Sequence, residues 1–202
     1  MLDARAVRYP DRRVALFEDG SSWTYAECRQ RVRSAAAALQ ALGVRKGDRV
    51  NAWLPTGMPM VLTWFATNYL GAIFVPMNTA YRGQVLEHVI NSAGASVMVA
   101  HPDLVERLSG LDLPKLRHVI GASALEGDAA NLDDCAVIDH WDIQCIIYTS
   151  GTTGPSKGVL SPYLQLYTTA VVNYGYLEEG ESILVNLPMF HVGGTSPTYC
   201  AL

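Results

Sequence analysis

The apolar residues over 25–42 recur every three or four positions, which is the spacing of one face of a helix. Thr24 and Glu27 have the spacing of a capping box at the start of this segment, and Gly43 follows its end. A short apolar run at 14–18 precedes it and is typical of a strand. The pattern therefore predicts a strand, a turn and then a long helix over 25–42.

The alternation of strand and helix continues along the chain. Further helices are predicted at 59–69, 84–91 and 103–108, strands at 50–54, 72–75, 97–100, 118–120, 145–148 and 183–187, and a surface loop at 121–134. Strands that alternate with helices usually pair in parallel, with helices on both faces of the sheet. The expected fold class is therefore α/β, with a parallel-rich sheet and helices on both faces.

The stretch Met58–Met77 is uncharged and long enough to cross a membrane. Pro59 and Pro76 bracket it, and Gly71 divides it. A helix, a glycine stop and a buried strand explain this pattern better than a membrane span. The first dozen residues are rich in charge and contain no apolar run, so we expect no signal peptide.

Composition narrows the choice of partner and compartment. The 202 residues are half apolar, carry a formal net charge of −4 and contain no basic run, so neither nucleic acid nor an anionic membrane surface is an expected partner. None of the four cysteines stands in a CxxC pair, and free thiols in a cytoplasmic protein are expected, with two disulfides as the alternative. The histidine spacing fits no metal site, and none is expected.

The segment IIYTSGTTGPSKGVLSP, residues 146–162, carries the candidate chemistry. Glycines, hydroxyl side chains and Lys157 follow a predicted strand, and Ser161 with Pro162 is predicted to begin a helix. Glycines let backbone N–H groups approach phosphate oxygens closely, and a lysine adds a positive charge. The segment therefore suits an anion, with an ordinary surface turn as the alternative.

Spacing excludes three better-known loops. A Walker loop starting at Gly151 needs glycine where Ser156 stands and a hydroxyl residue where Gly158 stands. A nucleophile elbow around Ser150 needs glycine at 148 and 152, which are tyrosine and threonine. The dinucleotide pattern GxGxxG is absent from the segment as well.

The string YTSGTTGPSKGV resembles the phosphate-binding signature of the adenylate-forming superfamily, to which acyl-CoA synthetases belong. LGVRKGDRVNAWLP, YLGAIFVPMN and LPMFHVGG resemble other motifs of that family, in the family's order. Within the superfamily, the last of these motifs looks most like the one in acyl-CoA synthetases. The resemblance implies that residues 1–202 are the N-terminal portion of the AMP-binding domain, a partial N-terminal domain of the acyl-CoA synthetase-like fold.

The resemblance also implies a reaction. A carboxylic acid substrate attacks the α-phosphate of ATP, held with Mg²⁺, and the thiol of coenzyme A then displaces AMP from the acyl-adenylate. His191 would border the acyl and adenylate site as the candidate catalytic residue, with a packed histidine as the alternative. The implied ATP- and phosphate-binding residues are Thr149, Ser150, Gly151, Thr152, Thr153, Gly154 and Lys157.

Later parts of that family have no counterpart in these 202 residues, including the magnesium-binding glutamate, the ribose-binding aspartate and the small C-terminal domain with its lysine. We therefore expect the chain alone to be inactive. A non-catalytic nucleotide-binding or assembly fragment is the alternative function, and an unrelated phosphate-binding hydrolase is a third. Uncovered apolar faces and a sheet edge favour self-association into a homo-oligomer, with a covering partner as the alternative. Asn51 stands where the family usually has a small apolar residue.

Overall fold

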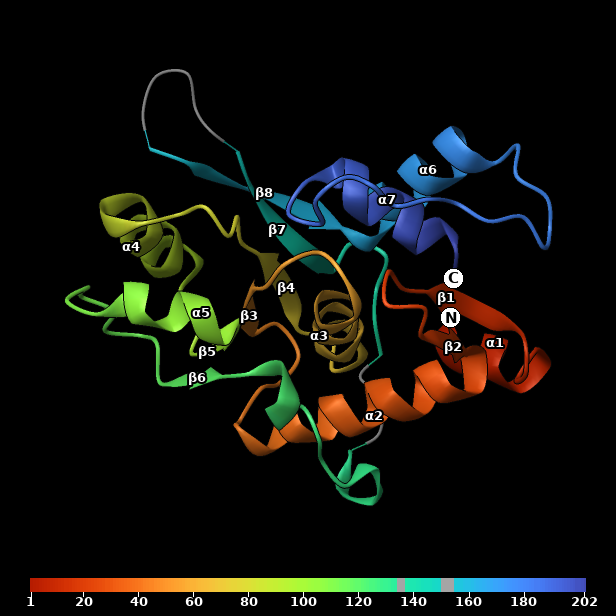
Figure 1. Ribbon diagram of the computed structural model, residues 1–202, viewed down its shortest axis with the longest axis horizontal. Helices are drawn as coiled ribbons and strands as arrows, with labels where there is room; N and C mark the ends of the chain where they lie inside the picture. Colours follow the sequence, from red (N-terminus) through yellow and green to blue (C-terminus); the bar gives the residue numbers. More distant parts are fainter. Residues whose placement is uncertain (134–136, 150–154) are drawn as a thin grey trace.

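The structure, a computed structural model, describes residues 1–133, 137–149 and 155–202. Within them a six-stranded sheet in the order β6-β5-β3-β4-β7-β8 forms the centre of the molecule (Figure 1). All neighbours in this order pair in parallel except β7 and β8, which are antiparallel. The strands are β3 Arg49–Trp53, β4 Ile73–Pro76, β5 Val97–Ala100, β6 His118–Ile120, β7 Ile143–Thr149 and β8 Lys157–Pro162.

Helices cover both faces of the sheet, as the alternating pattern predicts. Helices α2 (Tyr25–Ala41) and α3 (Met58–Tyr69) pack on one face, and α4 (Gly83–Ala93) and α5 (Pro102–Val105) pack on the other (Figure 1). Successive residues of β3 divide between the two cores, because side chains alternate along a strand. Ala52 packs beneath α2 and α3, whereas Trp53 packs beneath α4.

The N-terminal part confirms the predicted helix start. Helix α1 (Leu2–Arg8) precedes a small antiparallel hairpin of β1 (Arg13–Leu16) and β2 (Ser22–Thr24). The Thr24 hydroxyl accepts from the Glu27 N–H at 3.2 Å, and the Glu27 carboxylate accepts from the Thr24 N–H at 2.8 Å. This capping box satisfies two backbone donors at the start of α2.

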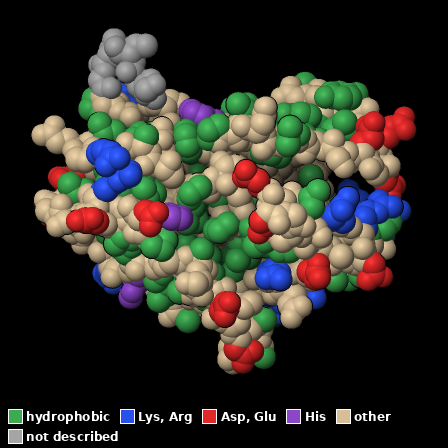
Figure 2. Space-filling view, in the orientation of Figure 1, with side chains coloured by type: hydrophobic (Ala, Val, Ile, Leu, Met, Phe, Trp, Pro, Cys, Tyr) green, Lys and Arg blue, Asp and Glu red, His purple; other side chains and the backbone are tan. Residues whose placement is uncertain are grey.

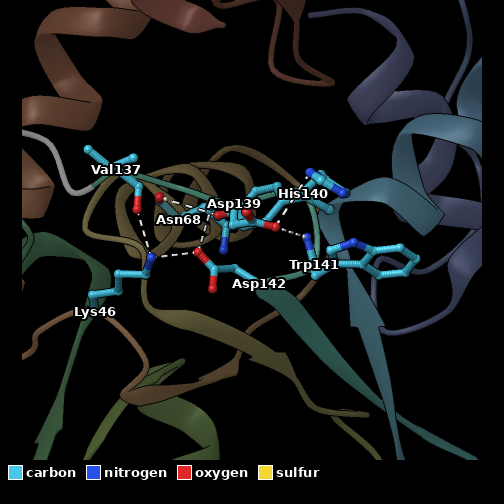
Figure 3. Close-up of polar contacts among 8 residues, drawn as sticks. Lys46, Asn68, Val137, Asp139, His140, Trp141 and Asp142 are labelled. Carbon is cyan, nitrogen blue, oxygen red and sulfur yellow. Dashed lines mark hydrogen bonds and ion pairs between the residues drawn. The ribbon is translucent and has the colours of Figure 1, made fainter.

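Polar contacts join segments that are distant in sequence (Figure 3). Nζ of Lys46, in the turn before β3, donates to the Val137 carbonyl oxygen at 2.7 Å and pairs with the Asp142 carboxylate at 2.6 Å. Asn68 of α3 donates from Nδ2 to the carbonyl oxygen of Gln144 at 2.9 Å. These contacts hold the start of β7 beside β3 and α3.

The helix predicted to begin at Ser161 and Pro162 is present but begins one residue later, as α6 (Tyr163–Tyr174) with Pro162 at its N-cap and no side-chain cap. The prediction of Ser161 as the cap is wrong, because pairing with β7 extends β8 through Ser161 and Pro162. Residues 183–187 form no strand, since no described strand lies beside them to pair with their backbone groups.

The predicted surface loop at 121–134 is more ordered than expected over the residues that the structure describes. It contains the short 3₁₀ turns η2 (Ala122–Ala124) and η3 (Ala129–Asn131), in addition to η1 (Glu106–Leu108), which extends α5. The Ser34 hydroxyl of α2 donates to the Gly127 carbonyl oxygen and accepts from the Gly127 N–H. Leu125 is buried beside them.

The uncharged stretch 58–77 forms α3 and β4, as predicted. Among the described residues no helix is long and apolar enough to span a membrane. The last element is α7 (Val192–Cys200), which packs against α6 over β7 (Figure 1).

Candidate functional site

The end of the β7–β8 hairpin brings two predicted phosphate-binding residues together. Thr149, the last residue of β7, lies opposite Lys157, the first residue of β8, and both are exposed. Residues directly opposite in an antiparallel pair point to the same face. A hydroxyl donor and an ammonium group therefore project side by side. The predicted residues Ser150, Gly151, Thr152, Thr153 and Gly154 lie outside the described part of the chain.

The alternation along β7 shows which face this pair occupies. Ile146 and Tyr148 pack towards α4, whereas Cys145 and Ile147 pack into the core that contains Met189. Thr149 continues the second series, because side chains of a strand alternate between faces. The Thr149–Lys157 pair therefore belongs to the face on which α7 packs.

His191 lies at the start of α7 on this same side of the sheet. Its backbone N–H donates to the Pro188 carbonyl oxygen at 3.0 Å, and its ring lies 4.6 Å from the Phe190 ring, centroid to centroid. A Cβ at Gly194 would come within 2.5 Å of the Pro188 oxygen, so glycine permits this tight entry into the helix. The imidazole is exposed, unlike a packed core histidine.

The structure brings two of the predicted site residues together and leaves the third without a contact to them among the described residues. It places Thr149 and Lys157 in direct register, but no contact among the described residues joins either of them to His191. Nor does the Lys157 side chain form an ion pair or hydrogen bond with another residue in the part of the chain that the structure describes.

A metal centre is not visible in the described residues, where no group of three or more histidine, cysteine, aspartate or glutamate side chains could hold an ion. The chemistry of the hairpin end is that of a hydroxyl and a cation, which suits phosphate oxygens better than a metal.

Sequence reasoning missed His88 of α4. Its Nε2 lies 2.9 Å from the carbonyl oxygen of Ser156, immediately before β8. Tyr81, which precedes α4, also lies at Ser156: burial raises the pKa of Tyr81, and the Ser156 side chain partly opposes that rise. No local pattern could identify these contacts, because they join segments far apart in the sequence.

Comparisons with known proteins show which family the sequence matches. The family model described as "AMP-binding enzyme" matches residues 2–202. A Mycobacterium tuberculosis enzyme described as 3-[(3aS,4S,7aS)-7a-methyl-1,5-dioxo-octahydro-1H-inden-4-yl]propanoyl:CoA ligase is 35% identical over 94% of this chain and 41% of its own length. A feruloyl-CoA synthase from Amycolatopsis is 35% identical over 93% of this chain and 38% of its own length.

Solved structures show the same fold. A fatty acyl-CoA synthetase from Mycobacterium tuberculosis superposes with a TM-score of 0.88 at 25% identity, over 99% of this chain and 42% of that protein. The o-succinylbenzoate-CoA synthetase of Bacillus subtilis, in complex with its acyl-adenylate intermediate, gives 0.84 at 26% identity, over 99% of this chain and 52% of that one. This chain thus spans about two fifths of the length of the curated relatives described above.

Proposed function

This chain belongs to the family of AMP-binding enzymes, and we propose that it supplies the phosphate-binding end of an enzyme that activates a carboxylic acid with ATP and passes the acyl group to coenzyme A. The relatives with 35% identity are named as CoA ligase and CoA synthase, which supports this reaction class. The substrates in their names differ, and the substrate class that we propose is a carboxylic acid.

The observation that carries the proposal is the register of Thr149 with Lys157 at the end of the hairpin. The Thr149 hydroxyl donates to a phosphate oxygen, and the ammonium group of Lys157 neutralises charge on the β- and γ-phosphates. ATP, bound with Mg²⁺, supplies the α-phosphorus that the carboxylate attacks. His191, exposed at the start of α7, borders the space in which the acyl group and adenylate lie.

Binding of inorganic tripolyphosphate and of Mg-ATP, measured by titration calorimetry, tests this role. Lys157→Ala is expected to weaken binding and raise both dissociation constants by about ten- to a hundredfold, because it removes a charged hydrogen-bond donor. Lys115→Ala is the matched control, since Lys115 is also exposed and the charge change is the same. Equal affinities of the two variants would contradict the proposal, as would wild-type protein that binds neither ligand.

Because the chain spans about two fifths of the length of its curated relatives, we propose that the reaction needs residues outside it. We expect the purified 202-residue chain to show no carboxylate-dependent exchange of pyrophosphate into ATP. A longer protein that contains this sequence together with the rest of the family's domains is expected to show it. Exchange by the short chain above background would overturn this part of the proposal.

A further inference from the structure

Ser156 is held against the middle of α4. Nε2 of His88 lies 2.9 Å from the Ser156 carbonyl oxygen, and the two residues are 68 positions apart in the chain. A carbonyl oxygen only accepts hydrogen bonds, so Nε2 must carry the proton and donate it. The backbone at Ser156, immediately before β8, is therefore hydrogen-bonded to α4, which packs beneath the hairpin.

Helix α4 is a rigid support for this contact. Its apolar side chains are buried against the sheet, namely Leu86, Val89, Ile90 and Ala93. The helix ends at Gly94, whose φ of +64° suits glycine. The guanidinium group of Arg49 donates to the carbonyl oxygens of Ala93, at 3.1 Å, and Gly94, at 2.8 Å. Arg49 begins β3, so α4 is tied to the centre of the sheet.

The same helix also reaches the other strand of the hairpin. Ser92 lies one helical turn after His88, on the same face of α4. Its side chain interacts with the Tyr148 hydroxyl of β7 and opposes the rise in the pKa of Tyr148 that burial causes. Tyr81 adds its interaction with the Ser156 side chain. Helix α4 and the residue Tyr81 before it therefore hold both strands close to where the hairpin ends.

We propose that His88 is a positioning residue for polyphosphate binding, acting through Ser156 on the Thr149–Lys157 pair. This inference rests on the proposed function of that pair. Holding the Ser156 carbonyl group fixes the backbone at the next residue, Lys157, from which the ammonium group extends. Thr149–Lys157 is the last described pair of the ladder, so the bond from α4 restrains it where strand pairing alone is weakest.

The test uses inorganic tripolyphosphate and three variants at one position. His88→Ala removes the donor, His88→Gln keeps an N–H group at similar reach, and His88→Asn places the same amide one methylene short. We expect His88→Ala and His88→Asn to raise the dissociation constant for tripolyphosphate by about three- to tenfold, which is the effect of one lost hydrogen bond. His88→Gln should bind within about twofold of wild type. Val85→Ala, at an exposed position of the same helix, is the control and should bind as wild type does.

Hydrogen exchange of the ligand-free protein gives an independent readout. The amides at the start of β8 should exchange faster in His88→Ala and His88→Asn, whereas those of β3 should not change. If His88→Ala does not fold, the comparison of His88→Gln with His88→Asn still tests the inference. Wild-type affinity in His88→Asn, or equal weakening in His88→Gln and His88→Asn, would overturn the inference. Failure of the wild type to bind tripolyphosphate would overturn the proposed function, while unchanged exchange in His88→Asn would overturn the anchoring role itself.

Discussion

Tyr148 packs its ring against Gly158, the residue opposite it in the β7–β8 hairpin. A Cβ added at Gly158 would lie 3.2 Å from Cζ of Tyr148 and 2.7 Å from Cγ2 of Ile146. The φ angle of Gly158 is not positive. Glycine is therefore needed here for packing space and not for an unusual backbone angle.

Gly158→Ala is expected to lower the free energy of unfolding by about 1–3 kcal/mol, because the added methyl group overpacks the side chains of Tyr148 and Ile146. Gly121→Ala is the matched control, since its new Cβ would lie an ordinary 3.7 Å from the Ser123 hydroxyl oxygen. Urea unfolding of both variants measures the difference. Equal midpoints for the two would show that the hairpin accommodates the methyl group without cost.

Local signals predict the start of α2 correctly and the end of β8 incorrectly. The capping box of Thr24 and Glu27 is a local signal, and the structure confirms it with both of its hydrogen bonds. Ser161 and Pro162 give an equally local signal for a helix start. Pairing with β7 outweighs that signal, since a strand partner supplies hydrogen bonds that no short sequence window reveals.

The residues of the candidate site also differ in whether a local sequence pattern reveals them. Thr149 and Lys157 are recognisable because they belong to one continuous motif, and their facing positions follow once the segment folds as a hairpin. His88 is not recognisable, because its role depends on α4 packing beneath that hairpin. Residues that support a site from another element thus require the tertiary structure.

Asn51 provides a second prediction. It lies in the central strand β3 between Val75 and Met98, is fully buried, and has no described hydrogen-bond partner for Oδ1 or Nδ2. A buried amide without partners destabilises the fold, so Asn51→Val should raise the free energy of unfolding by about 1–3 kcal/mol.

The control for Asn51 is Asn68, whose Nδ2 donates to the carbonyl oxygens of Ala72 and Gln144. Asn68→Val should lower the stability, because it removes both bonds. Chemical unfolding of the two variants should therefore show changes of opposite sign in the free energy of unfolding. A loss of stability in Asn51→Val would mean that this amide has a partner after all.

Two buried thiols predict a dependence of stability on pH. Burial raises the pKa of Cys28 and of Cys145 from 9.0 to about 12. The folded state therefore favours the neutral thiols, and their contribution to stability is complete below about pH 9 and is lost as the pH rises towards 12. At pH 10.5 each thiol should cost about 2 kcal/mol relative to pH 8.

Urea unfolding at pH 8 and pH 10.5 measures this loss. The double variant Cys28→Ala, Cys145→Ala is the control, since it keeps the buried tyrosines but lacks the two thiols. Its stability should fall less between the two pH values. An equal fall in both proteins would show that the thiols do not contribute to the alkaline loss of stability.

The exposed apolar surface on the two sides of β8 predicts self-association. Leu160 of β8 is 58% exposed on the side of the sheet that carries α4. Val172 of α6 is 80% exposed on the other side, where Figure 2 shows hydrophobic side chains gathered over α6 and α7. Strand β8 also ends the sheet among the described residues, which leaves backbone groups at its edge for another strand.

We expect the wild-type chain to sediment as dimers or larger species whose share rises with concentration, because association removes this surface from water. The double variant Leu160→Lys, Val172→Lys should shift the distribution towards monomer, whereas Val85→Lys, a similar change on the exposed side of α4, should not. A wild-type chain that sediments as a single monomeric species at every concentration, without binding an apolar dye, would contradict this expectation.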